Sequence, residues 1–124
     1  MPPDRDDCLF CKLYAEGTHV AKSDGFVAIE DINPQADVHL LVIPERHVDT
    51  FRDVGQFSAE ETKRMLEFVA ETAAAAGLED YRIAINVGRS AGQTIFHLHL
   101  HVLGGKLHID KMLETLANEE VTAP

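Results

Sequence analysis

The chain has 124 residues, of which 45% are hydrophobic and 26% charged, so we expect one soluble globular domain over residues 1–124. Its 21 acidic residues against 11 basic ones give a net charge of −10, which argues against binding to a nucleic-acid backbone. No apolar run reaches the length of a membrane helix, and residues 1–7 lack the apolar region of a signal peptide. We therefore expect a cytoplasmic protein that binds neither nucleic acid nor membrane.

The first motif is Cys8-Leu-Phe-Cys11, which holds both cysteines of the chain. In a reducing cytosol a structural disulfide is not expected. Two thiolates at this spacing form half of a tetrahedral zinc site, and histidines have to supply the other half, for which His47 and His97 are the best candidates. Two alternatives stay open: a thioredoxin-like dithiol, which no preceding strand supports, and a pair of ordinary reduced cysteines without metal.

Residues 12–44 are interpreted as strands. Two segments within them, 25–31 and 38–43, are rich in β-branched residues and are separated by an Asn-Pro turn. This arrangement predicts an antiparallel hairpin with a long loop. Asp31 lies at the edge of that loop, and His39 lies in the second segment, where a lone histidine is most often a hydrogen-bonded core residue.

A long helix is predicted over residues 58–77. Ser58 and Glu61 have the spacing of a capping box, and Gly77 is placed to end the helix. The apolar stripe is broader than one core face requires, which favours packing on the sheet and also on a second copy of the chain. A helix buried wholly within one subunit is the alternative. The stripe consists of Met65, Leu66, Phe68, Val69, Ala70, Ala73 and Ala76.

The segment 81–87 is predicted to be a strand that brings the side-chain amide of Asn86 to a ligand site. A glycine-rich turn follows over residues 88–92, where backbone N–H groups can approach an anion closely because glycine has no Cβ. Gln93 and Thr94 add polar side chains. Together these groups could surround a phosphate without a lysine.

Three histidines then alternate with apolar residues over 96–102. A period of two predicts a strand with His97, His99 and His101 on one face. Neighbouring histidines would be about 6–7 Å apart and the outer two about 13 Å, so an unbent strand does not close all three on one ion. The other interpretations are a polar face on a half-exposed strand, and a divided role in which one outer histidine is structural and two face a substrate.

The sequence His97-Leu-His99-Leu-His101-Val resembles the signature of the histidine triad (HIT) superfamily of nucleotidyl hydrolases and transferases. The resemblance covers about residues 8–105. It implies an α+β fold in which an antiparallel sheet of about five strands is joined by one long helix and a C-terminal helix, and a homodimer formed through helix 58–77. Further stretches resemble the Hint-like branch, the purine nucleoside phosphoramidases of the zinc-containing bacterial type: 31–36, 39–44, 92–94 and 102–105.

The resemblance implies a structural zinc ion held by Cys8, Cys11, His47 and His97. It also implies that the central histidine attacks the α-phosphorus of a purine nucleoside phosphoramidate and forms a covalent nucleotidyl-histidine that water hydrolyses. The implied catalytic residues are His99, His101, Thr94 and His39. The implied nucleotide-binding residues are Leu9, Phe10, Ile29, Asp31, Ile32, Asn86, Gly92, Gln93, Thr94, His99 and His101. The alternatives are a nucleotidyl transferase or dinucleoside polyphosphate hydrolase of another HIT branch, and a zinc-stabilised nucleotide-binding module without turnover.

The chain departs from the family pattern after Gly105. The characterised animal Hint-like proteins end in a short Trp-Pro-rich tail that reaches the partner's active site, whereas this chain has no Trp. Because a different segment takes the place of that tail, the sequence does not define which leaving group the substrate carries. His108 could substitute locally, or it could face solvent at the start of a helix. Residues 106–117 read as that helix, with apolar positions at Ile109, Met112, Leu113 and Leu116.

Overall fold

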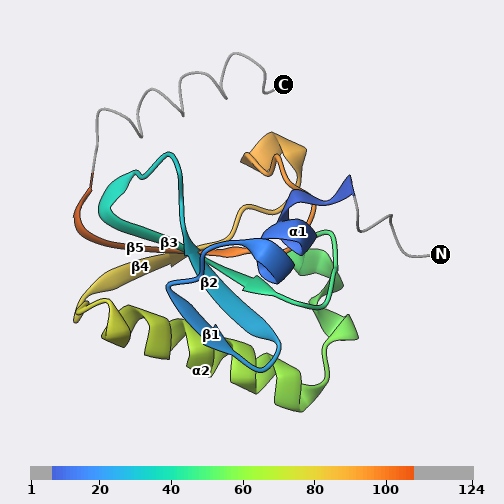
Figure 1. The fold of residues 1–124 in the computed structure, drawn as a ribbon. Coiled ribbons are helices and arrows are strands. Elements are labelled where there is room, and N and C mark those ends of the chain that lie inside the picture. The colour runs from blue at the N-terminus through green and yellow to red at the C-terminus, as the bar shows by residue number, and fades with distance from the viewer. Residues whose placement is uncertain (1–6, 108–124) are drawn as a thin grey trace.

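The computed structural model describes residues 7–107, which form a five-stranded antiparallel sheet with one helix on each face (Figure 1). The strand order is β1-β2-β3-β5-β4, so β3 lies in the middle with β5 beside it. In chain order the elements are α1 (Leu9–Glu16), β1 (Ala21–Ser23), β2 (Phe26–Glu30), β3 (Ala36–Pro44), η2 (Phe51–Gln56), α2 (Ala59–Ala75), β4 (Tyr81–Ala84), η3 (Arg89–Ala91) and β5 (Leu100–Leu107).

The predicted hairpin is present as β2 and β3, which pair antiparallel with Ile29 opposite Leu41. Successive side chains of a strand point to opposite faces, so these strands contribute to two cores. Ala28, Leu40 and Val42 belong to the core that α2 covers. The opposite face packs beneath α1 through Val27, Ile29, Leu41 and Ile43. Burial on both faces explains why the strands read as nearly continuous apolar runs.

The interpretation of residues 12–44 as strands is wrong at its start, because Leu9–Glu16 forms helix α1. The Sγ atom of Cys8 caps this helix by accepting the N–H of Cys11 over 3.3 Å. Phe10, Leu13 and Tyr14 have the i, i+3, i+4 spacing of one helix face, and they pack on the second core. The apolar stripe covers little more than one turn, which is too short to predict a helix from the sequence. The helix forms because this stripe is buried against the sheet.

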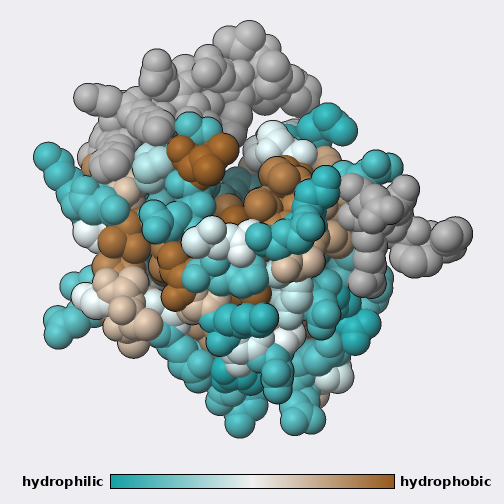
Figure 2. Space-filling view, viewed as in Figure 1, coloured by the Kyte–Doolittle hydropathy of each residue, from teal (hydrophilic) through white to brown (hydrophobic). Residues whose placement is uncertain are grey.

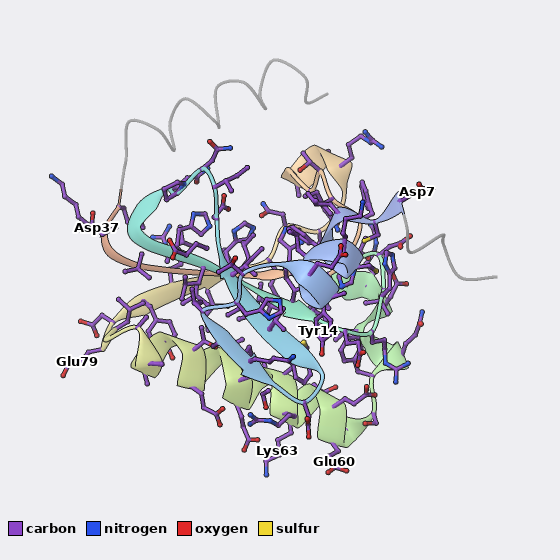
Figure 3. The ribbon with its side chains drawn as sticks, viewed as in Figure 1. Asp7, Tyr14, Asp37, Glu60, Lys63 and Glu79 are labelled. Carbon is purple, nitrogen blue, oxygen red and sulfur yellow. The ribbon has the colours of Figure 1, made fainter. Side chains whose placement is uncertain are left out.

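The predicted long helix is present as α2, with Ser58 as its N-cap and both capping-box hydrogen bonds to Glu61 in place. Leu66 is 57% exposed, and no described residue covers this side of the predicted stripe. Glu60 and Lys63 point from α2 away from the sheet (Figure 3). The side of α2 that packs on the sheet consists of Met65, Phe68, Val69, Thr72 and Ala73.

The predicted strand through the three histidines is correct only in its second half, because β5 begins at Leu100. Ahead of it, the N–H of Leu98 donates to the carbonyl of Val48 over 2.8 Å, and the ring of His97 is bonded to the carbonyl of Pro44. These long-range bonds replace the ladder bonds of a strand. β4 is likewise shorter than the predicted segment 81–87 and forms an edge of the sheet.

β5 continues to Leu107, so Lys106 and Leu107 are strand residues and not the start of the predicted C-terminal helix. The carboxylate of Asp37 accepts the N–H of Lys106 over 2.9 Å at this end of the sheet (Figure 3). Within residues 7–107 no helix is both long and apolar enough to cross a bilayer. The rest of the predicted C-terminal helix lies outside the described residues, with His108, Ile109, Met112, Leu113 and Leu116.

Candidate functional site

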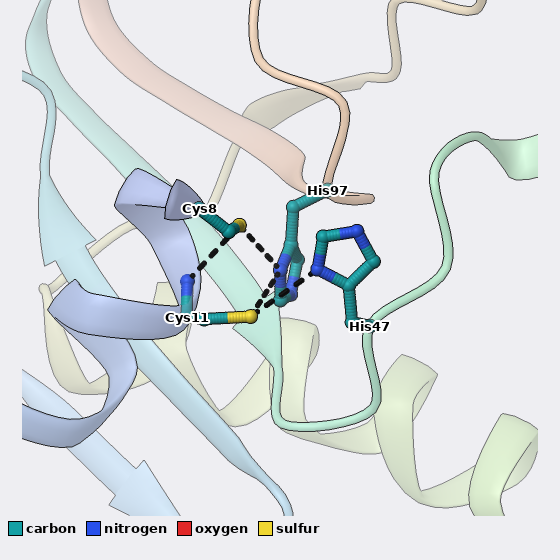
Figure 4. A group of neighbouring side chains, drawn as sticks. All are labelled: Cys8, Cys11, His47 and His97. Carbon is teal, nitrogen blue, oxygen red and sulfur yellow. Dashed lines mark hydrogen bonds between the residues drawn. The ribbon is translucent and has the colours of Figure 1, made fainter. Parts of the chain in front are cut away.

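Two cysteines and two histidines from distant parts of the chain meet at the start of α1 (Figure 4). One ligand atom from each of Cys8, Cys11, His47 and His97 lies within 4.8 Å of all the others. The Nδ1 atom of His97 is 3.4 Å from Cys8 Sγ and 3.5 Å from Cys11 Sγ, and the Nδ1 atom of His47 is 3.2 Å from Cys11 Sγ. The structure thus brings together all four residues that the sequence analysis selected as zinc ligands.

The outer ring nitrogens of both histidines are hydrogen-bonded in the way that suits a metal site. The Nε2 of His97 donates to the carbonyl of Pro44 over 2.8 Å, and the Nε2 of His47 donates to the Asp49 carboxylate over 3.1 Å. Each neutral ring then has its lone pair on Nδ1, facing the sulfur atoms. Two thiolates and two imidazoles are a common ligand set for structural zinc, so these residues fit that ion.

A cleft of about 500 Å³ lies beside this cluster and is lined by His99 and His101. Apolar residues surround a hollow in the upper half of the view in Figure 2. Leu9 and Ile32, both of which line the cleft, are 49% and 93% exposed. Exposed apolar side chains beside a hollow provide a surface on which a flat apolar ligand group can pack.

A larger hollow of about 780 Å³ lies between the start of α2 and the β1–β2 turn. Both arginines that line it form ion pairs: Arg46 with Glu61 at 3.0 Å, and Arg64 with Glu67 at 3.5 Å. No histidine or cysteine lines it. Because the histidines line the smaller cleft and not this hollow, we take the smaller cleft as the candidate functional site.

The hydrogen bond of His99 fixes which of its nitrogens is reactive. Its Nδ1 lies 2.8 Å from the carbonyl oxygen of His97, which can only accept, so Nδ1 carries the hydrogen. The lone pair of the neutral ring is therefore on Nε2. Burial lowers the pKa of His99, which keeps the ring neutral near pH 7. The ring edge-packs on Phe10, with the ring centroids 4.7 Å apart.

His101 is oriented by a chain of hydrogen bonds that begins in the backbone. The N–H of Gln35 donates to Nδ1 of His39 over 3.0 Å, so the hydrogen of the neutral His39 ring is on Nε2. That Nε2 lies 2.8 Å from Nδ1 of His101 and 3.3 Å from the Asp31 carboxylate. His101 accepts at Nδ1 and carries its own hydrogen on Nε2. Burial, followed by the neighbouring rings of His99 and His39, lowers the pKa of His101 to about 4.

Comparison with known proteins agrees with this geometry. The family model for the HIT domain matches residues 13–108. The chain belongs to the HIT family. Protein HitA of Neisseria gonorrhoeae is 39% identical over 103 residues, which are 80% of this chain and 96% of that protein. An uncharacterized HIT-like protein of Synechocystis is 36% identical over 105 residues, 82% of this chain and 92% of that protein.

Solved structures of HIT proteins share the fold. A HIT family hydrolase from Legionella pneumophila superimposes with a TM-score of 0.75 at 39% identity, covering 81% of this chain and 94% of that one. A Zn-bound histidine triad family protein from Mycobacterium smegmatis gives a TM-score of 0.67 at 30% identity, covering 83% and 78%. The predicted α+β fold with a five-stranded antiparallel sheet is confirmed.

Most residues that the HIT resemblance implied for nucleotide binding line the cleft. Asn86 is among them, and its Nδ2 donates to the carbonyl of Ala91 over 2.8 Å, which braces the glycine-rich turn. Gly92 of that turn has φ +92°, a conformation that favours glycine. The cleft-lining members of the implied set are Leu9, Phe10, Ile29, Asp31, Ile32, Asn86, Gly92, Thr94, His99 and His101.

Gln93 is the exception, because its side chain is buried and faces the protein interior. Its Oε1 accepts the N–H of Gly88 over 2.9 Å, and its Nε2 donates to the carbonyls of Asp49 and Ile95 over 2.7 and 3.1 Å. All of its polar atoms are used inside the protein, so it braces the turn and does not line the cleft. The sequence does not show whether a polar residue beside a glycine-rich turn faces the ligand site or the protein interior.

Several other residues that line the cleft are absent from the set that the sequence implied, among them Gln35 and Arg82. The backbone N–H of Gln35 sets the hydrogen-bond direction of His39, and a backbone group has no signature in a sequence. Arg82 lines the cleft from β4, and the alternation of Arg82 with Tyr81 and Ile83 was the one signal that could have placed it on the opposite face from them.

Proposed function

We propose that this HIT protein is a zinc-stabilised nucleotide hydrolase that cleaves purine nucleoside phosphoramidates through a covalent nucleotidyl-His99 intermediate. The observation that carries the proposal is the bond from His99 Nδ1 to the His97 carbonyl, which leaves an unprotonated Nε2 in the cleft. A neutral imidazole is a competent nucleophile near pH 7. The names of HIT family hydrolases from Legionella pneumophila and Clostridium thermocellum support the reaction class.

The nucleotide is proposed to lie along the cleft from its apolar end to the glycine-rich turn. The base packs in the slot of Leu9, Phe10, Ile29 and Ile32, whose chemistry suits a flat aromatic ring. The Asp31 carboxylate accepts hydrogen bonds from the ribose hydroxyls. The phosphate lies between the histidines and the turn at Gly92, where Asn86 and the backbone surround it.

In the first step His99 Nε2 attacks the α-phosphorus, and the bond from phosphorus to the leaving nitrogen breaks. That nitrogen takes up a proton from solvent, for which the Thr94 hydroxyl is the assigned relay, and departs as an amine. His101 donates its Nε2 hydrogen to a phosphoryl oxygen, where negative charge increases in the transition state. Water then attacks the phosphorus and releases a proton to solvent. The bond from phosphorus to His99 Nε2 breaks, which restores the neutral ring and frees a nucleoside monophosphate. His39 supports the sequence by holding the tautomer of His101.

The proposed zinc ion is structural, and Cys8, Cys11, His47 and His97 hold it. When bound, it cross-links the start of α1 to the segment that precedes β5 and takes no part in the reaction. The Zn-bound relative from Mycobacterium smegmatis supports the ion, as does the donor set. A cytoplasmic location, which we also propose, would keep both thiols reduced and able to bind metal.

A homodimer through α2 belongs to the same proposal. Leu66 is 57% exposed on the side of α2 that faces away from the core, and a second copy of the chain would cover it. Ala70, one helical turn from Leu66, is also exposed, and contiguous exposed apolar side chains mark contacts with other proteins. Purine preference rests on the Hint-like resemblance, whereas the expectation that no nucleic acid is bound rests on the net charge of −10.

The test is intact-protein mass spectrometry after rapid quenching with adenosine 5′-phosphoramidate. Wild type is compared with His99→Ala and with His19→Ala, a histidine that does not line the cleft. We expect an acid-labile gain of one nucleotidyl unit in wild type and His19→Ala, and none in His99→Ala. Nucleotide binding with neither adduct nor monophosphate product would instead identify a binding module. An adduct that forms in His99→Ala would refute the assigned nucleophile.

A further inference from the structure

The two cysteines of the chain differ in how a small solute reaches them. A hollow of about 490 Å³ opens beside the start of α1, and Cys8 lines it together with His47 and Thr94. Both cysteines are partly exposed, but Cys11 does not line this hollow. A small solute that enters the hollow therefore meets the side chain of Cys8 and not that of Cys11.

The backbone of α1 stabilises negative charge on the sulfur of Cys8. Cys8 is the N-cap of this helix, and its Sγ accepts the N–H of Cys11 over 3.3 Å. The first N–H groups of a helix favour an anion, and a cysteine in such a position is more nucleophilic. Oxidation of cysteine follows the nucleophilic character and the exposure of the sulfur. Cys8 has both properties.

Cys11 is placed to react with a modified Cys8. The two Sγ atoms lie within 4.8 Å of each other, and both face the Nδ1 atom of His97, at 3.4 and 3.5 Å (Figure 4). Neither cysteine is in a disulfide. A disulfide requires the sulfurs to approach to about 2.0 Å, and Cys-x-x-Cys pairs at helix starts form such bonds. The pair thus has an accessible sulfur and a second sulfur close behind it.

We propose that Cys8 and Cys11 form an oxidative modification site, in which a hydroperoxide oxidises Cys8 and Cys11 then closes a disulfide. The Cys8 thiolate attacks the outer peroxide oxygen, the O–O bond breaks, and the leaving oxyanion takes a proton from solvent. Cys8 is now a sulfenic acid. The Cys11 thiolate attacks its sulfur, the S–O bond breaks, and the departing hydroxide becomes water. The two thiolates have lost two electrons and one hydroperoxide has gained them.

The disulfide removes two of the four candidate metal ligands, so an ion held by the cluster is released. The effect reaches the cleft through His97, whose fully buried ring loses both thiolates as partners. The carbonyl of the same residue holds Nδ1 of His99 over 2.8 Å. Oxidation therefore lowers turnover at His99. This last step rests on the proposed hydrolase function, whereas the thiol chemistry does not.

The test treats zinc-loaded wild type with hydrogen peroxide and traps sulfenic acid with dimedone at successive times. Peptide mapping should place the early dimedone adduct on Cys8. Without dimedone, intact-protein mass spectrometry should show the loss of two hydrogens, and a chromogenic dye should register release of about one zinc ion per chain at the same rate. Dithiothreitol should reverse the mass change. A first adduct on Cys11, or zinc release without a disulfide, would overturn the proposal.

Two matched variants separate the two sulfurs. Cys11→Ser keeps the attacked sulfur and should accumulate sulfenic acid on Cys8, with no disulfide within the chain. Cys8→Ser should react with peroxide severalfold more slowly, at Cys11 alone. Because either variant loses a candidate metal ligand, wild type stripped of metal with a chelator is measured beside them. Equal rates of modification at the two cysteines in that stripped protein would contradict the assigned order of attack.

Turnover of adenosine 5′-phosphoramidate measures the coupling to His99. In oxidised wild type kcat/KM should fall severalfold, and dithiothreitol added together with zinc should restore it. Unchanged kcat/KM in fully oxidised protein would refute the coupling. A reduced, zinc-loaded protein without turnover would refute the hydrolase function, while the dimedone, mass and zinc measurements would still decide whether the cysteine pair is the modification site.

Discussion

His99 donates its Nδ1 hydrogen to the backbone carbonyl of His97 over 2.8 Å, while the ring of His97 faces the two cysteines. One residue therefore belongs to the cysteine–histidine cluster and also sets the tautomer of the candidate nucleophile. Phe10, which lies between the cysteines in sequence, packs edge-on against the His99 ring. The cluster and the cleft are thus one connected structure.

Removing a thiol is expected to release the metal and weaken this connection. Cys11→Ala should reduce bound zinc from about one ion per chain toward none, because a tetrahedral site loses one of four ligands. The midpoint of thermal unfolding should fall by on the order of 10 °C, since metal binding is coupled to folding. Elemental analysis and calorimetry measure the two effects. His19→Ala is the control, and unchanged zinc content in Cys11→Ala would disprove the site.

Gln93 is expected to matter for stability more than for ligand contact. Gln93→Leu leaves the Gly88 N–H and the carbonyls of Asp49 and Ile95 without their partner inside the protein. Urea unfolding should show a loss of about 2 kcal/mol, the usual cost of unsatisfied buried polar groups. If Gln93→Leu keeps wild-type stability but loses nucleotide affinity, Gln93 contacts the nucleotide and does not brace the turn.

The stability of the protein should depend on pH through His101. Its pKa in the folded protein is about 4, below the ordinary value of 6.5, so the unfolded chain binds more protons between these two values. Its contribution to the free energy of unfolding is complete above pH 6.5 and is lost as the pH falls toward 4. The loss is on the order of 3 kcal/mol, from about 1.36 kcal/mol per pH unit.

Comparison with His101→Gln isolates this effect from the other acid-sensitive groups. Chemical unfolding of both proteins is measured at intervals between pH 7 and pH 4. The wild type should lose more stability over this range than the variant. Parallel curves for the two proteins would show that the folded state does not disfavour the charged form of His101.

The exposed side of α2 predicts a change of oligomeric state. Leu66→Glu places a charge in the proposed dimer contact and should shift the protein to the monomer mass in light scattering. Glu60→Gln, on a side chain that points into solvent from the same helix, is the matched control (Figure 3). A wild type that is monomeric at all concentrations, or a dimeric Leu66→Glu, would rule out this interface.

The sequence by itself determined the elements that rest on local patterns. The capping box of Ser58 and Glu61 fixed the start of α2, because both bonds form within one helical turn. The apolar runs of β2 and β3 predicted their hairpin. The chemistry of the residues, including two thiols and an alternating run of histidines, identified the family and the four candidate metal ligands before any contact was known.

The tertiary structure decided whatever depends on partners distant in the sequence. α1 forms because Phe10 and its neighbours are buried on the sheet, and the strand before Leu100 is interrupted because Val48 and Pro44 bind it from elsewhere. The tautomer of His101 depends on a backbone N–H of Gln35 acting through His39. Hydrogen-bond direction is a property of the two groups that meet, and only folding determines which groups those are.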